Sequence, residues 1–421
     1  YIPMRIHRMA SHAIVALSLL YLPITGAAQE GSHLSLQSAI ALAQQNNPQL
    51  MALRREIIAA KGRSWTTWWL ADPDLSIEWE GVPRGAGLRQ FDERKLSLTQ
   101  EIEFPTNILS RHRFAAREVE AAAMRFEQGH LEIRAQVIAT YARFLAGREG
   151  LALAKERVRL GQEFVDKAEI RRQVGEAPAI EMVRARVELA QAQNELLNAE
   201  SAYRAALAQL NAILSRPPDQ KISPGDSLVY QKYDVALAAI KQQALAQHPR
   251  LREANAQVGA ASHLRNLAWG SFLPAIQLSA FRHNIGGNPN FYGVQIGLKV
   301  PLWFPFRQRG EIQEASALLA AQEHQRANTQ LQLMAEIESA HAAFEAGRQQ
   351  AENYTTSLLE QAHEVYRIAL RSYEKGEAGY LQLLEAQQTL VEVRRGYLET
   401  LENYYSALAA LEVASGVAIL Q

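Results

Sequence analysis

The sequence YEKGEAGYLQLLEAQQTLVEVRRGYLETLENYYSALAAL (residues 373–411) decides the fold, because the chain contains a related copy of it 201 positions earlier. The earlier copy, RQVGEAPAIEMVRARVELAQAQNELLNAESAYRAALAQL (residues 172–210), aligns with it without a gap. Both copies carry the tripeptide Gly-Glu-Ala, at residues 175–177 and 376–378. A constant shift over this length indicates that one structural unit is duplicated.

Each copy is predicted to form a tight turn at Gly-Glu-Ala, followed by a long helix. Proline is absent from residues 179–216 and 306–421, and small or apolar residues recur every three or four positions. This spacing is typical of an amphipathic helix with one packed face. Taken alone, these features also fit a helical hairpin in an ordinary soluble bundle, so the rest of the chain must distinguish the two.

The N-terminal residues 1–28 have the pattern of a secretory signal peptide. Arg5 and Arg8 precede an apolar run at residues 13–22, and small residues follow at 25–28. The run is too short to span a membrane as a helix, although a retained membrane anchor is the alternative. The chain has no cysteine, which suits an exported protein that needs no disulfide. The formal net charge is zero and there is no basic cluster, so no nucleic-acid partner is expected.

The duplication extends over nearly the whole mature chain. Helices are predicted near the start of each half, with interruptions before Pro48 and Pro249, because a residue that precedes proline is disfavoured in the α conformation. The region between the halves is rich in proline and polar residues, and we predict that it lies outside the helical body. The predicted units are a first repeat at residues 29–214, a linker at 215–234 and a second repeat at 235–421.

Alternating apolar and polar residues predict four β-strands, two in each half. Strands of about ten tilted residues are long enough to cross the hydrocarbon layer of a membrane. Four strands cannot close a barrel, and open edges in lipid would leave backbone groups unpaired, so several chains would have to share one barrel. Two soluble hairpins that cap a helical domain are the alternative. The predicted strands lie near residues 75–81, 95–104, 275–283 and 291–300.

Two long proline-free segments, residues 106–174 and 306–375, are predicted to form helical rods. At 1.5 Å per residue each rod would be roughly 100 Å long, and it would have to pack against neighbouring rods as in a coiled coil. Gly147 and Gly347 are predicted to mark a matching irregularity in the two rods, at a shift of 200. The predicted fold class is mainly α with a small β part.

Three segments, in this order and with this duplication, resemble the TolC family of outer-membrane efflux channels. They are LSLQSAIALAQQNNPQL at residues 34–50, GLKVPLWFPFRQRGEIQEA at 297–315 and YEKGEAGYLQLLEAQQTL at 373–390. The resemblance implies a homotrimer in the outer membrane, in contact with its lipid, with a large periplasmic part. Four strands from each chain would build a twelve-stranded β-barrel, and the long helices would continue it as a periplasmic α-barrel.

The same resemblance implies two protein partners for the trimer. A periplasmic adaptor (membrane fusion) protein would dock on the helical hairpin tips, near residues 174–178 and 375–379, and an inner-membrane pump of the RND type would supply the energy. Glycine in these turns permits a close approach of backbone. The residues expected to contact the adaptor are Val174, Gly175, Glu176, Ala177, Gly376, Glu377, Ala378 and Gly379.

The resemblance also places a gate at the periplasmic tip, where acidic side chains narrow the channel. Tyr373 matches a tyrosine that in the family bonds to the acid at the Glu181 position, so this pair is expected to hold the tip shut. Gln382 departs from an all-acidic ring, whereas Glu385 retains a carboxylate. A solvated helix face is the alternative for each charged residue. The candidate gate residues are Glu181, Arg184, Tyr373, Gln382 and Glu385.

No motif for chemistry appears in the chain. Its 11 histidines lack metal-ligand spacing, and there is no nucleophile motif, phosphate loop or dinucleotide fingerprint, so we expect no enzyme, no cofactor and no metal site. The expected function is a passive conduit of a tripartite efflux system. The segments PDLSIEWEG (residues 73–81) and 297–315 resemble the heavy-metal branch of the family. The alternatives are a drug-efflux or type I secretion duct of the same family, or a soluble periplasmic coiled-coil scaffold.

Overall fold

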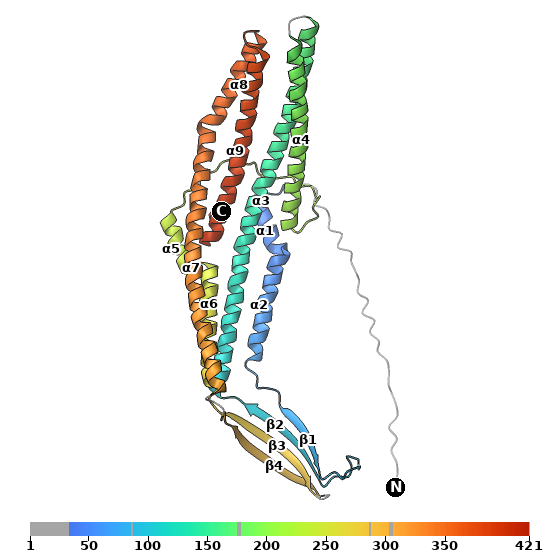
Figure 1. Ribbon diagram of the computed structural model, residues 1–421, viewed down its shortest axis with the longest axis vertical. Helices are drawn as coiled ribbons and strands as arrows, with labels where there is room; N and C mark the ends of the chain where they lie inside the picture. Colours follow the sequence, from blue (N-terminus) through green and yellow to red (C-terminus); the bar gives the residue numbers. More distant parts are fainter. Residues whose placement is uncertain (1–32, 86, 175–177, 286–287, 303–305, 421) are drawn as a thin grey trace, which may run out of the picture.

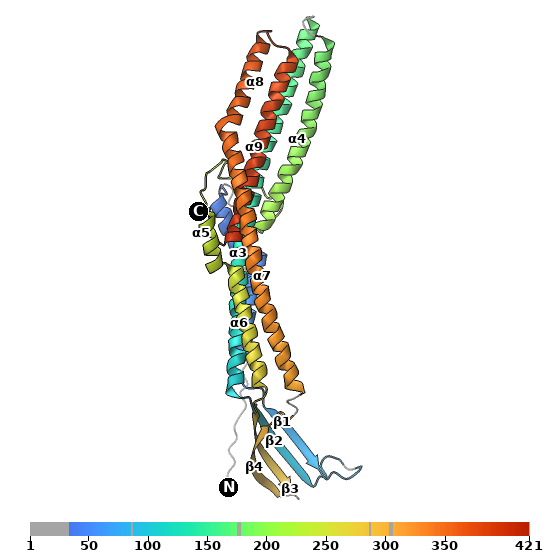
Figure 2. The same cartoon turned by 60° about the vertical axis from the view of Figure 1, so that its left-hand side comes forward.

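A computed structural model describes residues 33–85, 87–174, 178–285, 288–302 and 306–420. The molecule is elongated, with a small sheet at one end and the tips of two helical hairpins at the other (Figures 1 and 2). The predicted signal peptide lies outside the described residues, as do Gly175, Glu176 and Ala177 of the first hairpin turn.

Both halves follow the same order of elements. The first half contains α1 (Leu36–Asn46), α2 (Pro48–Thr66), β1 (Asp74–Glu80), β2 (Glu93–Ile102), α3 (Pro105–Gln173) and α4 (Ala179–Ile213). The second half contains α5 (Leu237–Gln247), α6 (Pro249–Gly270), β3 (Ala275–Ile285), β4 (Asn288–Lys299), α7 (Arg307–Asn353), a π-helical turn η1 (Tyr354–Leu358), α8 (Leu359–Glu374) and α9 (Tyr380–Ser415). The chain is therefore mainly helical with a small β part, as predicted.

The interruptions before Pro48 and Pro249 are present, and each is stabilised by the side chain that precedes the proline. Asn47 accepts a hydrogen bond from the Gln49 N–H at its Oδ1 atom, at 2.9 Å. His248 accepts one from the Arg250 N–H at its Nδ1 atom, at 3.1 Å. Such caps satisfy backbone donors that the first helical turn leaves unpaired, so α2 and α6 begin in the same way.

Gly147 and Gly347 mark close helix approaches and not the irregularity that was predicted. Both lie in regular helix, α3 and α7. A Cβ atom on Gly147 would lie 3.5 Å from the Tyr203 Cα atom of α4, and one on Gly347 would lie 3.3 Å from the Tyr404 Cα atom of α9. The glycines therefore let each rod lie against the next helix, because a side chain there would crowd its backbone.

The second rod is not continuous, contrary to the prediction, because η1 interrupts it. The Leu359 N–H donates to the Tyr354 carbonyl, five residues back, so this turn is one residue wider than an α-turn. The internal repeat explains the extra residue. Phe144 and Phe344, which pack on Tyr203 and Tyr404, differ by 200 positions, whereas Ala168 and Ala369 of the tip cluster differ by 201.

The inserted residue therefore lies in the second rod between the close approach at Gly347 and the tip. We interpret η1 as the place where the helix accommodates it without rotating α8 away from the tip. Helix α3 is regular α-helix throughout its 69 residues, and this includes the part that is equivalent to η1.

The linker at residues 215–234 forms no helix or strand, but it does not lie outside the helical body as predicted. Ile222 is buried in the central core, and Tyr230 and Tyr233 pack against that core. Two tyrosines of α9 bind its backbone: the Tyr404 hydroxyl donates to the Gln231 carbonyl at 2.8 Å, and the Tyr405 hydroxyl donates to the Val229 carbonyl at 2.7 Å. The linker thus belongs to the middle of the molecule.

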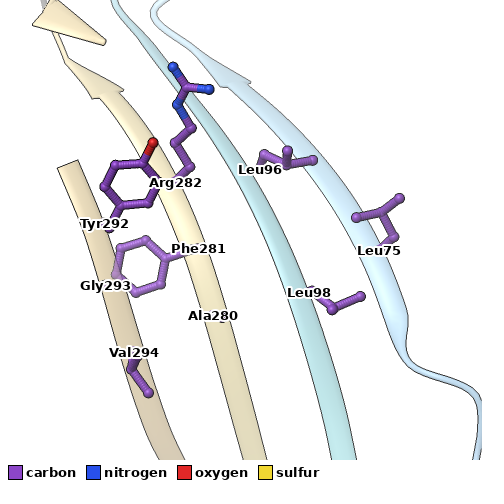
Figure 3. Close-up of a pocket in the computed structure, with 9 residues that line it drawn as sticks. All are labelled: Leu75, Leu96, Leu98, Ala280, Phe281, Arg282, Tyr292, Gly293 and Val294. Carbon is purple, nitrogen blue, oxygen red and sulfur yellow. The ribbon is translucent and has the colours of Figure 1, made fainter. Parts of the chain in front are cut away.

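The four strands form one antiparallel sheet in the order β1-β2-β3-β4. Register places Leu75 opposite Leu98, Leu98 opposite Ala280, and Ala280 opposite Val294, so one row of apolar side chains crosses all four strands (Figure 3). Because side chains alternate between the two faces of a sheet, the neighbouring rows lie on the same face, and they are largely apolar, with Arg282 in one row and Gln100 in the other. The exposed apolar members of this face include Leu75, Ile77, Leu96, Leu98, Ile276, Leu278, Val294, Ile296 and Leu298.

The opposite face of the sheet is mainly polar, although Phe281 of β3 also lies on it, opposite Ser97. The Ser76 and Ser97 hydroxyls lie 2.7 Å apart, and those of Thr99 and Ser279 lie 2.9 Å apart. Within the described residues, β1 and β4 each pair with one neighbour and leave their outer edges open. None of the helices in the described part of the chain is both long enough and apolar enough to cross a membrane.

Candidate gate at the tips of the helical hairpins

A small hydrophobic cluster joins the two hairpins near their tips. The rings of Phe164 in α3 and Tyr380 in α9 meet edge to face, with centroids 5.8 Å apart. Ala168 of α3, Ala185 of α4 and Leu383 of α9 are buried in the same cluster. Figure 1 shows that the hairpins stand side by side along this part of the molecule. The cluster therefore holds the α3–α4 hairpin against the α8–α9 hairpin within one chain.

The turn of the second hairpin depends on Gly376, whose φ is +76°. Glycine adopts this left-handed conformation without the steric cost that a side chain would add. The Glu377 and Ala378 N–H groups both donate to the Ser372 carbonyl, at 2.8 and 3.1 Å. Gly379 then precedes the first residue of α9. The described part of the first tip is Val174, next to the end of α3, and Pro178, which precedes α4.

Arg171 of α3 contacts both Tyr373 and Glu181. Its Nη1 atom donates to the Tyr373 hydroxyl at 3.2 Å and lies 3.8 Å from a Glu181 carboxylate oxygen. Its guanidinium carbon also lies 5.5 Å from the centre of the Tyr373 ring. Among the described residues, the Tyr373 hydroxyl and Glu181 meet through this guanidinium and not in the direct bond that was expected.

Sequence reasoning missed Arg171. It is one of two adjacent arginines in the last turn of α3, and its neighbour Arg172 pairs instead with Glu169 at 2.8 Å on the same helix. Only the rotation of α3 relative to α8 shows which of the two arginines faces Tyr373. The available signal was weak: a basic residue ahead of the Gly-Glu-Ala turn, opposite the acid in the next helix.

The other three candidate gate residues lie outside this cluster. Arg184, Gln382 and Glu385 are exposed on α4 and α9. In the part of the chain that the structure describes, neither Arg184 nor Glu385 belongs to an ion pair. The structure thus brings together Tyr373 and Glu181 and leaves Arg184, Gln382 and Glu385 on the surface, available to whatever surrounds the tip.

Tyr380 stays protonated in this cluster. Burial raises the pKa of the Tyr380 hydroxyl to about 12, and the nearby carboxylate of Glu188 and the groups of Tyr373 and Glu181 add to the increase. A phenol with this pKa is neutral at any physiological pH. In this cluster, the polar contact between the two hairpins is the hydrogen bond that Arg171 donates to the Tyr373 hydroxyl, and Glu181 pairs with Arg171 within the first hairpin.

Ion pairs also connect the hairpins farther from the tip. Arg395 of α9 lies 3.2 Å from a Glu195 oxygen of α4, and Arg157 of α3 pairs with the same carboxylate. Arg394 of α9 lies 3.2 Å from Glu156 of α3. Movement of one hairpin away from the other would break the pairs of Arg394 and Arg395 and the contact of Arg171 with Tyr373. The pairs Arg157–Glu195 and Arg171–Glu181 would stay within the first hairpin.

The site offers no arrangement for covalent chemistry. In residues 33–420, apart from the undescribed gaps, no three or more His, Cys, Asp or Glu side chains are placed to hold a metal ion. The charged residues of the tip sit in contacts between helices and on exposed helix faces. What the arrangement can do is join or separate two helical hairpins.

Comparison with known proteins defines the class. The family model described as outer membrane efflux protein matches residues 84–216 and 240–417. Among solved structures, the CmeC outer membrane channel of Campylobacter jejuni shares the fold, with a TM-score of 0.78 and 18% identity, over 90% of this chain and 85% of that one. The molecule is thus a channel component of the outer membrane. The chain belongs to the outer membrane efflux protein family, which confirms the resemblance seen in the sequence.

Two curated relatives are equally similar to the chain. The pyoverdine export outer membrane protein OpmQ of Pseudomonas putida is 23% identical over 408 residues, which span 90% of this chain and 85% of that protein. The cobalt-zinc-cadmium resistance protein CzcC of Cupriavidus metallidurans is 23% identical over 380 residues, which span 90% of this chain and 89% of that protein. Family membership makes the chain an outer-membrane protein and a conduit without enzymatic activity, and it excludes the soluble scaffold.

Proposed function

We propose that three copies of this chain form one closed channel through the outer membrane. The observation that carries the proposal is the sheet, whose described strands have one largely apolar face, one largely polar face and two open edges. Open edges cannot remain in lipid, because their N–H and C=O groups would lose water without gaining partners. Joining β4 of one copy to β1 of the next pairs every edge, and three copies give a barrel of twelve strands.

The helices would then continue this barrel as a periplasmic duct. Helix α3, with 69 residues, is long enough to reach about 100 Å from the sheet. In this arrangement the hairpin tips lie at the far end of the duct. We assign the closed state of the tip to Arg171, Tyr373 and Glu181, with Arg184, Gln382 and Glu385 facing the mouth or the neighbouring copies.

Two further partners follow from this arrangement. A periplasmic adaptor would dock on the hairpin turns, at Val174, Gly175, Glu176, Ala177, Gly376, Glu377, Ala378 and Gly379. An inner-membrane pump of the RND type would drive export, because a conduit has no energy source of its own.

We propose heavy-metal cations as the cargo. Similarity to CzcC over 89% of that protein supports this choice, together with the segments at residues 73–81 and 297–315. The equal similarity to a pyoverdine exporter supports the second candidate, a duct for organic molecules. Deleting the gene in its host distinguishes them. Metal export predicts increased sensitivity to zinc, cobalt or copper that the intact gene reverses, and sensitivity to drugs alone would contradict it.

The shared barrel has a direct chemical test. The chain contains no cysteine, so Ser76→Cys on β1 and Gln295→Cys on β4 introduce thiols only at the two sheet edges. We expect a short bis-maleimide to give covalent dimers and trimers of the double variant in membranes. Each single variant is the matched control and should give no trimer. Conducting membranes with no cross-linked species would contradict the proposed strand pairing, and loss of conductance altogether would contradict the channel.

A further inference from the structure

Four tryptophans gather where the helices meet the sheet. Trp65, Trp68 and Trp69 lie at or just beyond the end of α2, and Trp269 lies at the end of α6, which is the equivalent place in the second repeat. Their exposed fractions are 68%, 57%, 66% and 55%. Exposed indoles at this density indicate a binding surface, and indole rings favour the boundary between hydrocarbon and water.

The neighbouring helical turns carry cations. Lys61 and Arg63 precede the indoles on α2, and Arg265 precedes Trp269 by one turn on α6. Within the described ranges, none of these three side chains forms an ion pair with an acid. A fourth cation, Arg113, is exposed on α3 beside His112, whose ring lies 4.0 Å from that of Trp68.

Several acidic side chains in this region are already paired. Glu103 binds Arg111, and Glu101 lies 3.2 Å from Lys299. Asp72 and Asp74 follow the indoles on the side of the sheet, at the start of β1. Lys61, Arg63, Arg113 and Arg265 thus lie on the helical side of the tryptophans without an acidic partner among the described residues, and Glu314 of α7, which lines a pocket with Ala268 and Ser271, is the acid beside the end of α6.

We propose that Lys61, Arg63, Arg265 and the four tryptophans form a collar that binds anionic phospholipid headgroups at the periplasmic surface of the outer membrane. The inference rests on the proposed placement of the sheet in the membrane. The indoles lie at the level of the glycerol backbone, and the cations lie one to two helical turns farther out, at the level of the phosphates. Anionic lipid is the partner because its charge complements these cations.

Lipid-specific quenching of tryptophan fluorescence tests the collar. The chain has six tryptophans, and Trp79→Phe with Trp303→Phe leaves only the four of the collar. The protein is reconstituted in phosphatidylethanolamine vesicles that contain a minority of phosphatidylglycerol, and one lipid at a time carries bromine in its acyl chains. We expect brominated phosphatidylglycerol to quench about twofold more, molecule for molecule, than brominated phosphatidylethanolamine.

Charge removal provides the control. In the combined Lys61→Gln, Arg63→Gln and Arg265→Gln variant, both brominated lipids should quench the tryptophan fluorescence equally. This variant should still conduct. Lys155→Gln, Arg252→Gln and Arg326→Gln, which remove exposed cations far from the sheet, should retain the preference. Equal quenching of the unaltered collar by both lipids, in conducting vesicles, would overturn the inference and leave the channel intact. Absence of quenching by either lipid, together with absence of conductance, would overturn both.

Discussion

At the scale of single residues, His248 gives the cap of α6 a pH dependence that Asn47, the equivalent cap of α2, lacks. Burial lowers the pKa of the His248 imidazole, because a charged ring would lose its hydration; the hydrogen bond to the Val413 carbonyl opposes this shift, and Arg250 adds to it. The side chain caps α6 through Nδ1, which must be unprotonated to accept from the Arg250 N–H. Asn47 performs the same role in the first repeat without a titratable group.

Substitution His248→Asn should therefore reduce the acid sensitivity of the fold. The unfolded chain takes up a proton near pH 6.5 and the folded chain resists it, so this histidine removes stability as the pH falls below about 6.5, by at most about 1.4 kcal/mol per pH unit. Between pH 7 and pH 5, we expect the unfolding temperature of His248→Asn, measured by circular dichroism, to fall less than that of the unaltered protein. His324→Asn, at an exposed position of α7, is the control. If the unfolding temperature of His248→Asn depended on pH as steeply as that of the unaltered protein, His248 would not be the source of the acid sensitivity.

Arg171 provides a second residue-scale prediction, at the gate. Arg171→Gln should open the tip, because it removes the cation between Tyr373 and Glu181. The Arg171 side chain is 37% exposed, so solvent screening limits the effect to about 1 kcal/mol in each copy, or about fivefold in the open population. Planar-bilayer recordings should show larger or more frequent openings.

Arg172→Gln is the matched control for this experiment. It removes an adjacent arginine that pairs within α3, with Glu169. Its conductance should equal that of the unaltered channel. If the conductance of Arg171→Gln also equalled that of the unaltered channel, the closed tip would not depend on the contacts of Arg171.

At the scale of elements, the π-helical turn η1 predicts where the second rod tolerates a deletion. Removing Thr356 should convert η1 into regular helix and keep α8 in register with α9, because the turn holds one residue more than an α-helix needs. Removing Gln330 from regular helix α7 should instead rotate everything beyond it by about 100° and misplace the tip cluster.

The yield of trimer in the outer membrane and its unfolding temperature measure both deletions. We expect the chain without Thr356 to assemble nearly as well as the intact chain, and the chain without Gln330 to fail. Equal failure of the two would mean that the wide turn itself is required, for example for bending of the second hairpin.

At the scale of the whole molecule, the two faces of the sheet should respond oppositely to charge. Ile296 lies on the apolar face of β4 and is 73% exposed in the single chain, and Gln295 lies on the polar face. Ile296→Lys should cost about 2–4 kcal/mol of folding free energy if its position is near the middle of the bilayer. Gln295→Lys should cost little, because that face would line water.

Urea titration of folding into lipid vesicles measures this difference. The adjacent positions serve as controls for each other, since they share a strand and differ only in the face. Equal costs at the two positions would show that the apolar face does not meet lipid, and the barrel proposal would then fail.

The sequence by itself determined the order of elements, the breaks before Pro48 and Pro249, the four strands and the apolar face of the sheet. Each follows from local rules, namely the conformational limits of proline and the period of two or of three to four residues. The repeat of Gly-Glu-Ala was equally readable, because a repeat is visible without knowledge of any contact, and the structure describes the turn at its second copy, residues 376–378.

Only the tertiary structure decided which side chains meet across the hairpins. The contact of Arg171 with Tyr373 joins residues 202 positions apart and depends on how α3 is rotated against α8, which no local pattern specifies. The same holds for the position of the linker. The hydroxyls of Tyr404 and Tyr405 donate to its backbone carbonyls and so fix it against the core. The π-helical turn could also be found only in the structure. An inserted residue does not change the helix propensity of its neighbours, and it becomes visible only when the packing contacts on its two sides are compared between the repeats.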